Sequence, residues 1–232
     1  MAYNNKKVEG IKMKNIKKIL AIIAIIILIL VGAIYYFLTP SEKLDLSSTN
    51  KENRVVTSED LLKGASIDTF KVLNNPLRLE GKINVSDETV QNLVYTIMKK
   101  SDMENVEYSD IQVVKDRIKI VSPYKVLGFI DSQYELYLDL GVEKDNLVAT
   151  LNDFKIGKIK VSNTIIKNVL KKYKSTSGLK VEGNKFIVDK SNIYPMLVKK
   201  VDVKDNIVIL NVEVEAENVM EFLKNSKIGV IG

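Results

Sequence analysis

One uninterrupted apolar stretch, residues 19–38 (ILAIIAIIILILVGAIYYFL), limits what this chain of 232 residues can fold into more than any other feature. Its twenty residues include no charged side chain, no amide and no proline. At a rise of about 1.5 Å per residue they would form a helix about 30 Å long, the thickness of the hydrocarbon core of a bilayer. The stretch therefore predicts a transmembrane helix.

Lysines stand immediately before this stretch and predict its orientation. They are Lys12, Lys14, Lys17 and Lys18. Because an excess of lysine and arginine marks the cytoplasmic side of a span, we expect residues 1–18 to form a cytoplasmic tail. The bulk of the chain would then lie outside, and the protein would cross the cell membrane once.

A cleaved signal peptide is the competing interpretation of residues 19–38. The apolar run is longer than the usual core of 7–15 residues, and no small-x-small cleavage site follows it clearly. Tyr35, Tyr36 and Phe37 instead resemble the aromatic belt of a span that ends at the membrane surface. These features favour a retained anchor. Translation could start at Met1 or at Met13, and the sequence leaves both open.

The composition excludes several classes of function. Six of the 35 basic and one of the 29 acidic residues lie in residues 1–18, which leaves 29 basic and 28 acidic residues for the rest. A nearly neutral domain lacks the positive field that nucleic-acid binding requires. The chain also has no His and no Cys, the commonest ligands of zinc. We therefore expect no nucleic-acid partner, no metal site and no cofactor.

Residues 39–64 are predicted to form a flexible linker. Pro40 ends the apolar helix, and the polar, Ser- and Asn-rich stretch that follows has no hydrophobic periodicity. About 25 residues of random coil would reach roughly 25–30 Å. The domain would then be able to work at the outer leaflet and the nearby cell wall.

The remainder is predicted to form one extracytoplasmic α+β domain at residues 65–224, with a short tail at 225–232. Four segments show apolar residues at helical spacing: 86–100, 162–178, 191–200 and 219–223. Ser86 and Ser162 are suitable N-caps for the first two.

Alternation of apolar and polar residues predicts antiparallel strands, most clearly at 133–140 and 208–214. Residues 70–85 are expected to form two more. Lys-Asp-Asn occurs at 144–146 and at 204–206, and Asp and Asn tolerate the positive φ of tight hairpin turns.

The stretch 147–161 predicts a curved strand. Its apolar parity changes near Asn152 and Asp153 and again at Gly157, and each change indicates a bulge or bend. The expected fold is therefore a single N-terminal transmembrane helix followed by one ectodomain, in which a curved antiparallel sheet packs against two or three helices.

Known catalytic patterns are weak or missing. Ser-x-x-Lys occurs at Ser48, Ser122 and Ser177, which is about the number that chance predicts in a Lys-rich chain. Acidic residues of one parity lie on two predicted strands: Asp131, Glu135 and Asp139, and Glu213 and Glu215. They could serve a glycosidase, but a solvated sheet face is favoured because such faces are normally charged. We expect no enzyme, and a hydrolase is the hypothesis these residues favour least.

The segment Leu151-Asn152-Asp153-Phe154-Lys155-Ile156-Gly157-Lys158-Ile159, with the helix after Ser162, resembles the YpmS-like family of Gram-positive proteins. Further shared features are the basic start, the single span and an early helix at 86–100. The resemblance implies a membrane anchor and one extracytoplasmic domain. The domain of that family is also similar in outline to curved-sheet modules that hold acyl chains. This likeness implies, by analogy only, that the protein handles lipid or lipoteichoic acid.

Two hypotheses remain for a non-enzymatic module of the bacterial envelope. In the first, it binds lipid or a lipid-linked polymer in a groove with these candidate residues: Leu93, Ile97, Phe154, Ile156, Ile165 and Val169. Each of them is also a plausible core residue. In the second, the domain is a scaffold or regulator that binds a protein of the envelope machinery.

Overall fold

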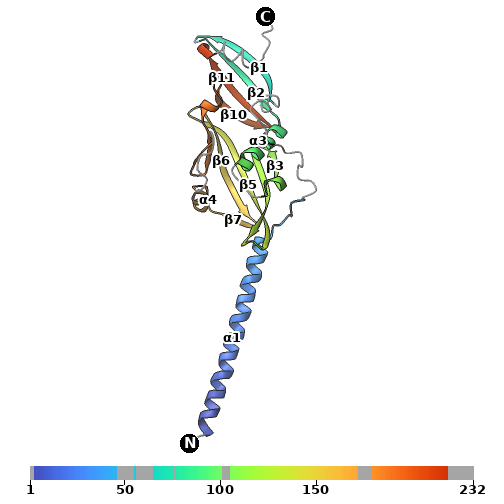
Figure 1. Ribbon diagram of the computed structural model, residues 1–232, viewed down its shortest axis with the longest axis vertical. Coiled ribbons are helices and arrows are strands. Elements are labelled where there is room, and N and C mark those ends of the chain that lie inside the picture. The colour runs from blue at the N-terminus through green and yellow to red at the C-terminus, as the bar shows by residue number, and fades with distance from the viewer. Residues whose placement is uncertain are drawn as a thin grey trace.

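The computed structural model describes residues 3–45, 55, 65–75, 77–100, 105–171 and 179–218. A long helix leads into an elongated domain in which two sheets follow one another along the long axis of the molecule (Figure 1). The helix predicted at 219–223 and the tail at 225–232 lie outside the described residues.

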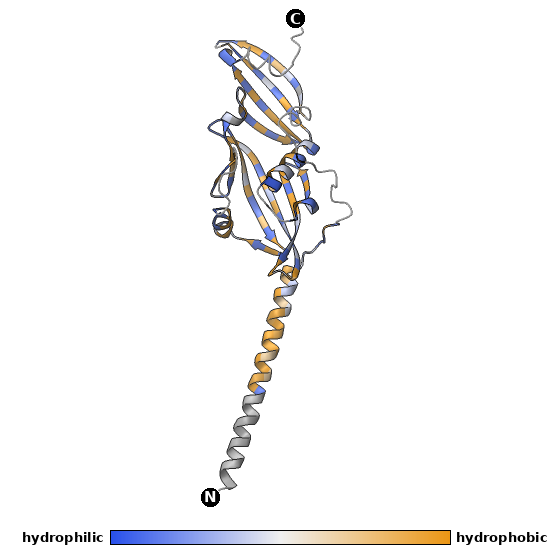
Figure 2. Cartoon of the chain, viewed as in Figure 1, coloured by the Kyte–Doolittle hydropathy of each residue, from blue (hydrophilic) through white to orange (hydrophobic). Residues whose placement is uncertain are grey.

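Helix α1 (Tyr3–Leu38) contains the apolar stretch. Its segment Lys18–Leu38 is long enough and apolar enough to cross a membrane, and most of its side chains, up to Phe37, are exposed. Figure 2 colours most of this segment as hydrophobic. The helix ends two residues before Pro40, as the sequence predicts, because proline disfavours the α conformation in the residue before it.

The domain is α+β, as predicted, but it contains two antiparallel sheets where one was expected. The smaller sheet has the order β1-β2-β11-β10, with strands β1 (Ala65–Asn74), β2 (Leu77–Val85), β11 (Ile207–Glu215) and β10 (Leu197–Lys204). The prediction failed because β11 pairs with β2, from Val208 opposite Val85 to Glu215 opposite Arg78. Periodicity shows that a strand exists, but it does not show which strand will pair with it.

The larger sheet lies next to α1 (Figure 1). Its order is β3-β4-β5-β6-β9-β8, with β7 also paired to β6. The strands are β3 (Asp110–Val114), β4 (Arg117–Val126), β5 (Ile130–Glu143), β6 (Asn146–Ile156), β7 (Ile159–Val161), β8 (Leu179–Glu182) and β9 (Lys185–Val188).

The main core lies where α3 (Asp87–Lys100) and α4 (Asn163–Leu170) meet the apolar face of the larger sheet. Both helices begin where the sequence predicts, because the hydroxyls of Ser86 and Ser162 accept backbone N–H groups of the first turn. Buried side chains from both helices, from the larger sheet, from the turn before β3 and from β11 form this core: Val90, Val94, Met98, Val106, Ile111, Val113, Ile118, Ile120, Tyr134, Leu138, Leu151, Ile166 and Val208.

The two Lys-Asp-Asn hairpins are confirmed. Lys144 and Asp145 have φ values of 53° and 63°, and Asp205 and Asn206 have values of 53° and 62°. Two consecutive residues with positive φ are typical of the type I′ turn, whose twist matches that of the flanking strands. These turns join β5 to β6 and β10 to β11.

The first irregularity predicted in residues 147–161 is a β-bulge. The register between β5 and β6 shifts where Glu135 faces Lys155 but Tyr137 faces Asn152, and Asp153 has φ 51°. The second, at Gly157, is sharper than predicted, because the chain reverses there and β7 pairs back onto β6. A single curved strand over 147–161 is therefore wrong, and two strands joined by a tight turn replace it.

The helix predicted at 191–200 is also wrong. A short 3-10 turn, η2 (Lys190–Asn192), precedes strand β10, which starts at Leu197. β10 pairs with β11 from Leu197 opposite Glu213 onward. The hydrogen bonds of this ladder outweigh the helical preference of a short segment, which is weak on its own.

Two strand glycines provide a matched test of the packing. A Cβ at Gly81 would lie 2.3 Å from the ring of Phe70 on the neighbouring strand, whereas a Cβ at Gly141 would meet nothing within 4 Å. We expect Gly81→Ala to lower the melting temperature, because the Phe70 ring must move from its place over the strand. Gly141→Ala should leave it unchanged or raise it, since glycine weakens a strand interior. Thermal unfolding followed by circular dichroism measures both, and equal losses would contradict this account.

Candidate functional site

The C-terminal end of α1 is hydrogen-bonded to the domain. We call this contact, between Phe37 and Leu38 of the helix and Ser132 and Lys158 of the domain, the junction. The backbone N–H of Lys158 donates to the Phe37 carbonyl at 2.8 Å, and the Ser132 hydroxyl donates to the Leu38 carbonyl at 2.5 Å. Thr39 donates to the Tyr35 carbonyl from its N–H and its hydroxyl. The last carbonyls of a helix have no partner within the helix. Here β5 and the β6–β7 turn supply two of the partners.

Gly157 allows α1 and the β6–β7 turn to approach this closely. A Cβ at this position would lie 2.2 Å from the Leu38 carbonyl oxygen and 2.7 Å from that of Phe37. Its φ of 58° also lies in the region that side chains disfavour. The loss of strand parity at Gly157 was visible in the sequence, but its contact with the helix was not.

Gln133 holds the segment that follows α1. Its side-chain Nε2 donates to the Glu42 carbonyl at 2.8 Å, and its Oε1 accepts the Leu44 N–H at 3.1 Å. Leu38 itself is buried. Residues 42 and 44 are thus held on the domain surface, and the linker over 39–64 as a whole stays a prediction. Residues 46–54 and 56–64 lie outside the described range.

The aromatic residues near the end of α1 carry one further contact. The Lys158 ammonium lies 3.5 Å from the centre of the Tyr36 ring, a cation–π arrangement. Tyr35, Tyr36 and Phe37 are otherwise exposed on the helix surface. At the junction, a lysine of the domain thus contacts the aromatic residues that the sequence predicts to lie at the membrane surface.

The six predicted groove residues occupy three different environments. Phe154 and Ile156 on β6 are partly buried against the main core. Leu93 and Ile97 on α3 are partly buried as well. Ile165 and Val169 lie on the open side of α4, with 54% and 46% of their surface exposed. The structure does not bring the six together in one described cavity, and only the α4 pair is freely accessible.

The polar face of the larger sheet is a network of ion pairs. Arg117 lies 3.1 Å from Asp139 and 3.0 Å from Asp153, which is also 2.7 Å from Lys160. Hydrogen bonds from Lys160 and then Arg117 lower the pKa of Asp153. The bond to Asp153, followed by the charge of Asp139, raises the pKa of Arg117.

Glu135 belongs to the same face and contacts two lysines, Lys155 at 3.1 Å and Lys119 at 3.5 Å. Its partial burial raises its pKa, but the hydrogen bond from Lys155 and the charge of Lys119 outweigh this, so the pKa lies below its ordinary value. A general acid needs a raised pKa. The carboxylate is therefore arranged as a counter-ion.

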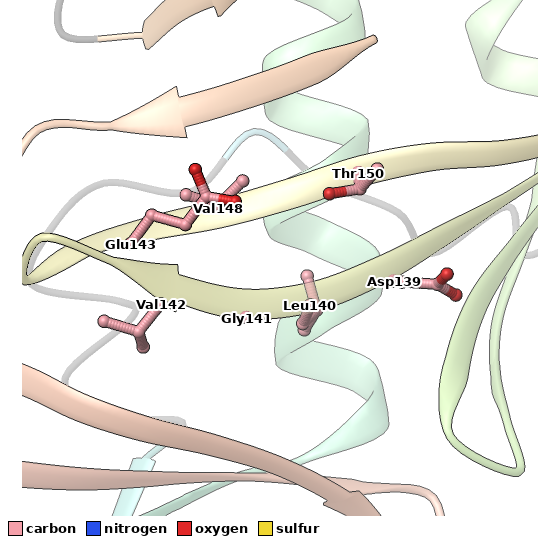
Figure 3. A pocket seen from close by; sticks show the side chains of 7 residues that line it. All are labelled: Asp139, Leu140, Gly141, Val142, Glu143, Val148 and Thr150. Carbon is pink, nitrogen blue, oxygen red and sulfur yellow. The ribbon is translucent and has the colours of Figure 1, made fainter. Parts of the chain in front are cut away.

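A hollow lies on β5 and β6, where Gly141 leaves space among Asp139, Glu143 and Thr150 (Figure 3). Leu140, Val142 and Val148 complete its lining. Asp139 is already engaged by Arg117 and by the Asn152 amide. Within the described residues, no group of three or more acidic side chains is arranged to hold a metal ion. None of the six groove candidates lines this hollow.

Comparison of the chain with protein-family models, curated protein sequences and solved structures gave no match. The resemblance to the YpmS-like family therefore stays a prediction.

The junction provides a first test. We expect Gly157→Ala to loosen the domain from α1, because the added methyl group cannot fit beside the Leu38 carbonyl. Gly183→Ala is the matched control, since Gly183 also has positive φ, 64°, but its Cβ position would meet only the flexible Lys167 side chain, at 3.8 Å. A dye on Asn75→Cys, the only cysteine in that variant, reports domain rotation through time-resolved anisotropy in nanodiscs.

In the parent chain, the anisotropy decay of the dye should report only the slow rotation of the whole disc. In the Gly157→Ala variant, the decay should also contain a faster component from rotation of the domain. Circular dichroism checks that the domain stays folded. Fast rotation in both the parent and the variant would show that the junction does not hold in solution.

The ion-pair network predicts a pH dependence. Because the folded pKa of Asp153 is lowered, its charge stabilises the fold above the unfolded pKa of about 3.9, and this contribution is lost as the pH falls through the folded value. Asp153→Asn keeps a side chain that tolerates φ 51° and removes the charge.

We expect Asp153→Asn to lower the free energy of unfolding at pH 7 by at most about 1 kcal/mol, since the pair is partly solvated. The difference should shrink toward pH 3 in urea titrations. Asp116→Asn, at a mostly exposed position 4.0 Å from Arg117, should have a smaller effect. If Asp153→Asn lowered the free energy of unfolding equally at pH 7 and pH 3, the charge of Asp153 would not be the cause of the loss.

Proposed function

We propose that the protein is a single-pass, membrane-anchored module of the bacterial cell envelope that presents its domain on the outer surface of the membrane and binds lipid or a lipid-linked polymer there. One observation carries the proposal. The domain is bonded directly to the end of a helix that is long and apolar enough to span a bilayer. A module built in this way works at the membrane surface and not at the end of a long tether.

The accessible apolar side chains near the junction favour lipid as the ligand. Ile159 follows Lys158 directly and is 42% exposed, and the exposed Ile165 and Val169 lie six and ten residues further along the chain, on α4. Because apolar surface is normally withdrawn from water, a group of such residues near the helix end is suited to contact with acyl chains. The internally paired charges of the sheet face leave no strong field for a polyanion.

A direct test uses the full chain purified in detergent and examined by native mass spectrometry. We expect lipid to remain bound and Ile165→Asp with Val169→Asp to reduce the bound fraction several-fold. Thr164→Asp with Asn168→Asp, which adds the same two negative charges at exposed positions of α4, is the control and should bind as the parent does. A chain that carries no lipid and takes up none when phosphatidylglycerol is added would overturn the lipid proposal.

The proposed orientation can be tested separately. In intact cells, a membrane-impermeant maleimide should label Asn75→Cys and leave Asn5→Cys unlabelled until the cells are opened. The lysines at 12, 14, 17 and 18 provide the physical reason. Labelling of Asn5→Cys in intact cells would show the opposite topology.

A protein partner is the second candidate function. Strand β1, at one edge of the smaller sheet, supports it: among the described residues β1 pairs only with β2, and such an edge can accept a strand from another chain. Crosslinking in cells from a cysteine at the exposed Val72 should then trap one defined protein. Scattered products would argue against it.

A further inference from the structure

The turn between β4 and β5 places two large apolar side chains in open solvent. Leu127 is 77% exposed and Phe129 is 73% exposed, more than any other large apolar residue among those the structure describes. Gly128 stands between them. Hairpin turns are normally polar, because nothing covers them. This three-residue turn, Leu127-Gly128-Phe129, is called the apolar tip below.

The backbone of the apolar tip is well defined. Leu127 and Gly128 have φ values of 53° and 79°, and the Phe129 N–H donates to the Val126 carbonyl at 3.3 Å. The strands are paired up to Val126 opposite Ile130. A leucine with positive φ is unusual and carries strain. The strained turn holds its two apolar side chains outward, although a polar residue would fit there at lower cost.

The position of the tip relative to α1 is fixed by the junction. Ser132, bonded to the Leu38 carbonyl, lies three residues after Phe129 on the same chain. At about 3.3 Å per residue, the tip lies within about 10 Å of that bond. Ile130, between them, is buried. Figure 1 shows the β4–β5 hairpin at the end of the domain beside the upper end of α1.

The flanking residues become polar away from the tip. Tyr124 is 40% exposed, and Lys125 pairs with Asp131 at 3.6 Å across the hairpin. An apolar end followed by a tyrosine and a lysine is the arrangement found where a protein enters the boundary between lipid and water. On the neighbouring turn, Lys158 contacts Tyr36 at the same end of the domain.

We propose that the apolar tip inserts into the outer leaflet beside the span, with Leu127 and Phe129 among the acyl chains and Tyr124 and Lys125 at the headgroups. The inference rests on the proposed anchoring of residues 19–38 in the membrane. The occupant of the tip is the phospholipid leaflet, because the junction places the tip next to the end of the helix that would emerge from it. The domain is then attached at two points, and its rotation about the axis of α1 is restricted.

The chain has no tryptophan, so single substitutions provide site-specific probes of depth. The full chain carrying Phe129→Trp is reconstituted in nanodiscs of phosphatidylethanolamine and phosphatidylglycerol. We expect its emission to shift to shorter wavelength relative to the same chain unfolded in urea. We also expect it to be quenched when lipids brominated near the top of the acyl chain replace part of the bilayer.

Two controls separate the possible failures. Tyr35→Trp reports the end of the span, and Tyr194→Trp, on an exposed residue after η2, reports a part of the domain away from the junction. Quenching of Tyr35→Trp and Phe129→Trp without quenching of Tyr194→Trp supports the insertion. Quenching of Tyr35→Trp alone overturns it while the anchoring stands. If Tyr35→Trp is not quenched either, the anchoring itself fails.

A second variant tests the consequence of insertion. Leu127→Ser with Phe129→Ser removes both apolar side chains at exposed positions, so the fold should remain intact. The Asn75→Cys dye should then show faster domain rotation about the helix axis in nanodiscs, but not in detergent micelles. Unchanged rotation in nanodiscs would contradict a second point of attachment.

Discussion

The carbonyl groups at the end of α1 need hydrogen-bond partners, and the arrangement of the whole chain depends on where they find them. A helix that ends in water can leave these groups to solvent. In this protein the Ser132 hydroxyl and the Lys158 N–H take that role for Leu38 and Phe37. Since both donors belong to the domain, the last turn of the helix becomes part of the domain surface. The orientation of the domain is thereby coupled to that of the helix.

This coupling gives the two sheets different positions relative to the proposed membrane. The larger sheet carries the junction, α4 and the apolar tip, whereas the smaller sheet occupies the far end (Figure 1). Lipid contact therefore belongs to the larger sheet in our proposal. The edge strand β1 of the smaller sheet is presented away from the junction, where a protein partner could reach it. The two hypotheses concern different ends of the same elongated domain.

The charges of the domain stabilise it internally. Arg117 with Asp139 and Asp153 carries one excess negative charge, and Glu135 with its two lysines carries one excess positive charge, so the two groups cancel. A face made of such pairs has little net field. The formal charge of +6 lies mostly in residues 1–18, which carry six basic residues and one acidic residue. The apolar side chains of α4 and the apolar tip are then the more distinctive surfaces near α1.

Local patterns determined much of this protein. The apolar run at 19–38, the caps at Ser86 and Ser162, the Lys-Asp-Asn turns and the bulge near Asp153 are all encoded within a few neighbouring residues, and each formed as predicted. Tertiary structure decided the rest. The pairing of β11 with β2, the strand at 197–204 and the contact of Gly157 with Leu38 join residues that are far apart in sequence. Hydrogen-bond partners across such distances leave no periodic signal in the chain, because each depends on a surface that exists only after folding.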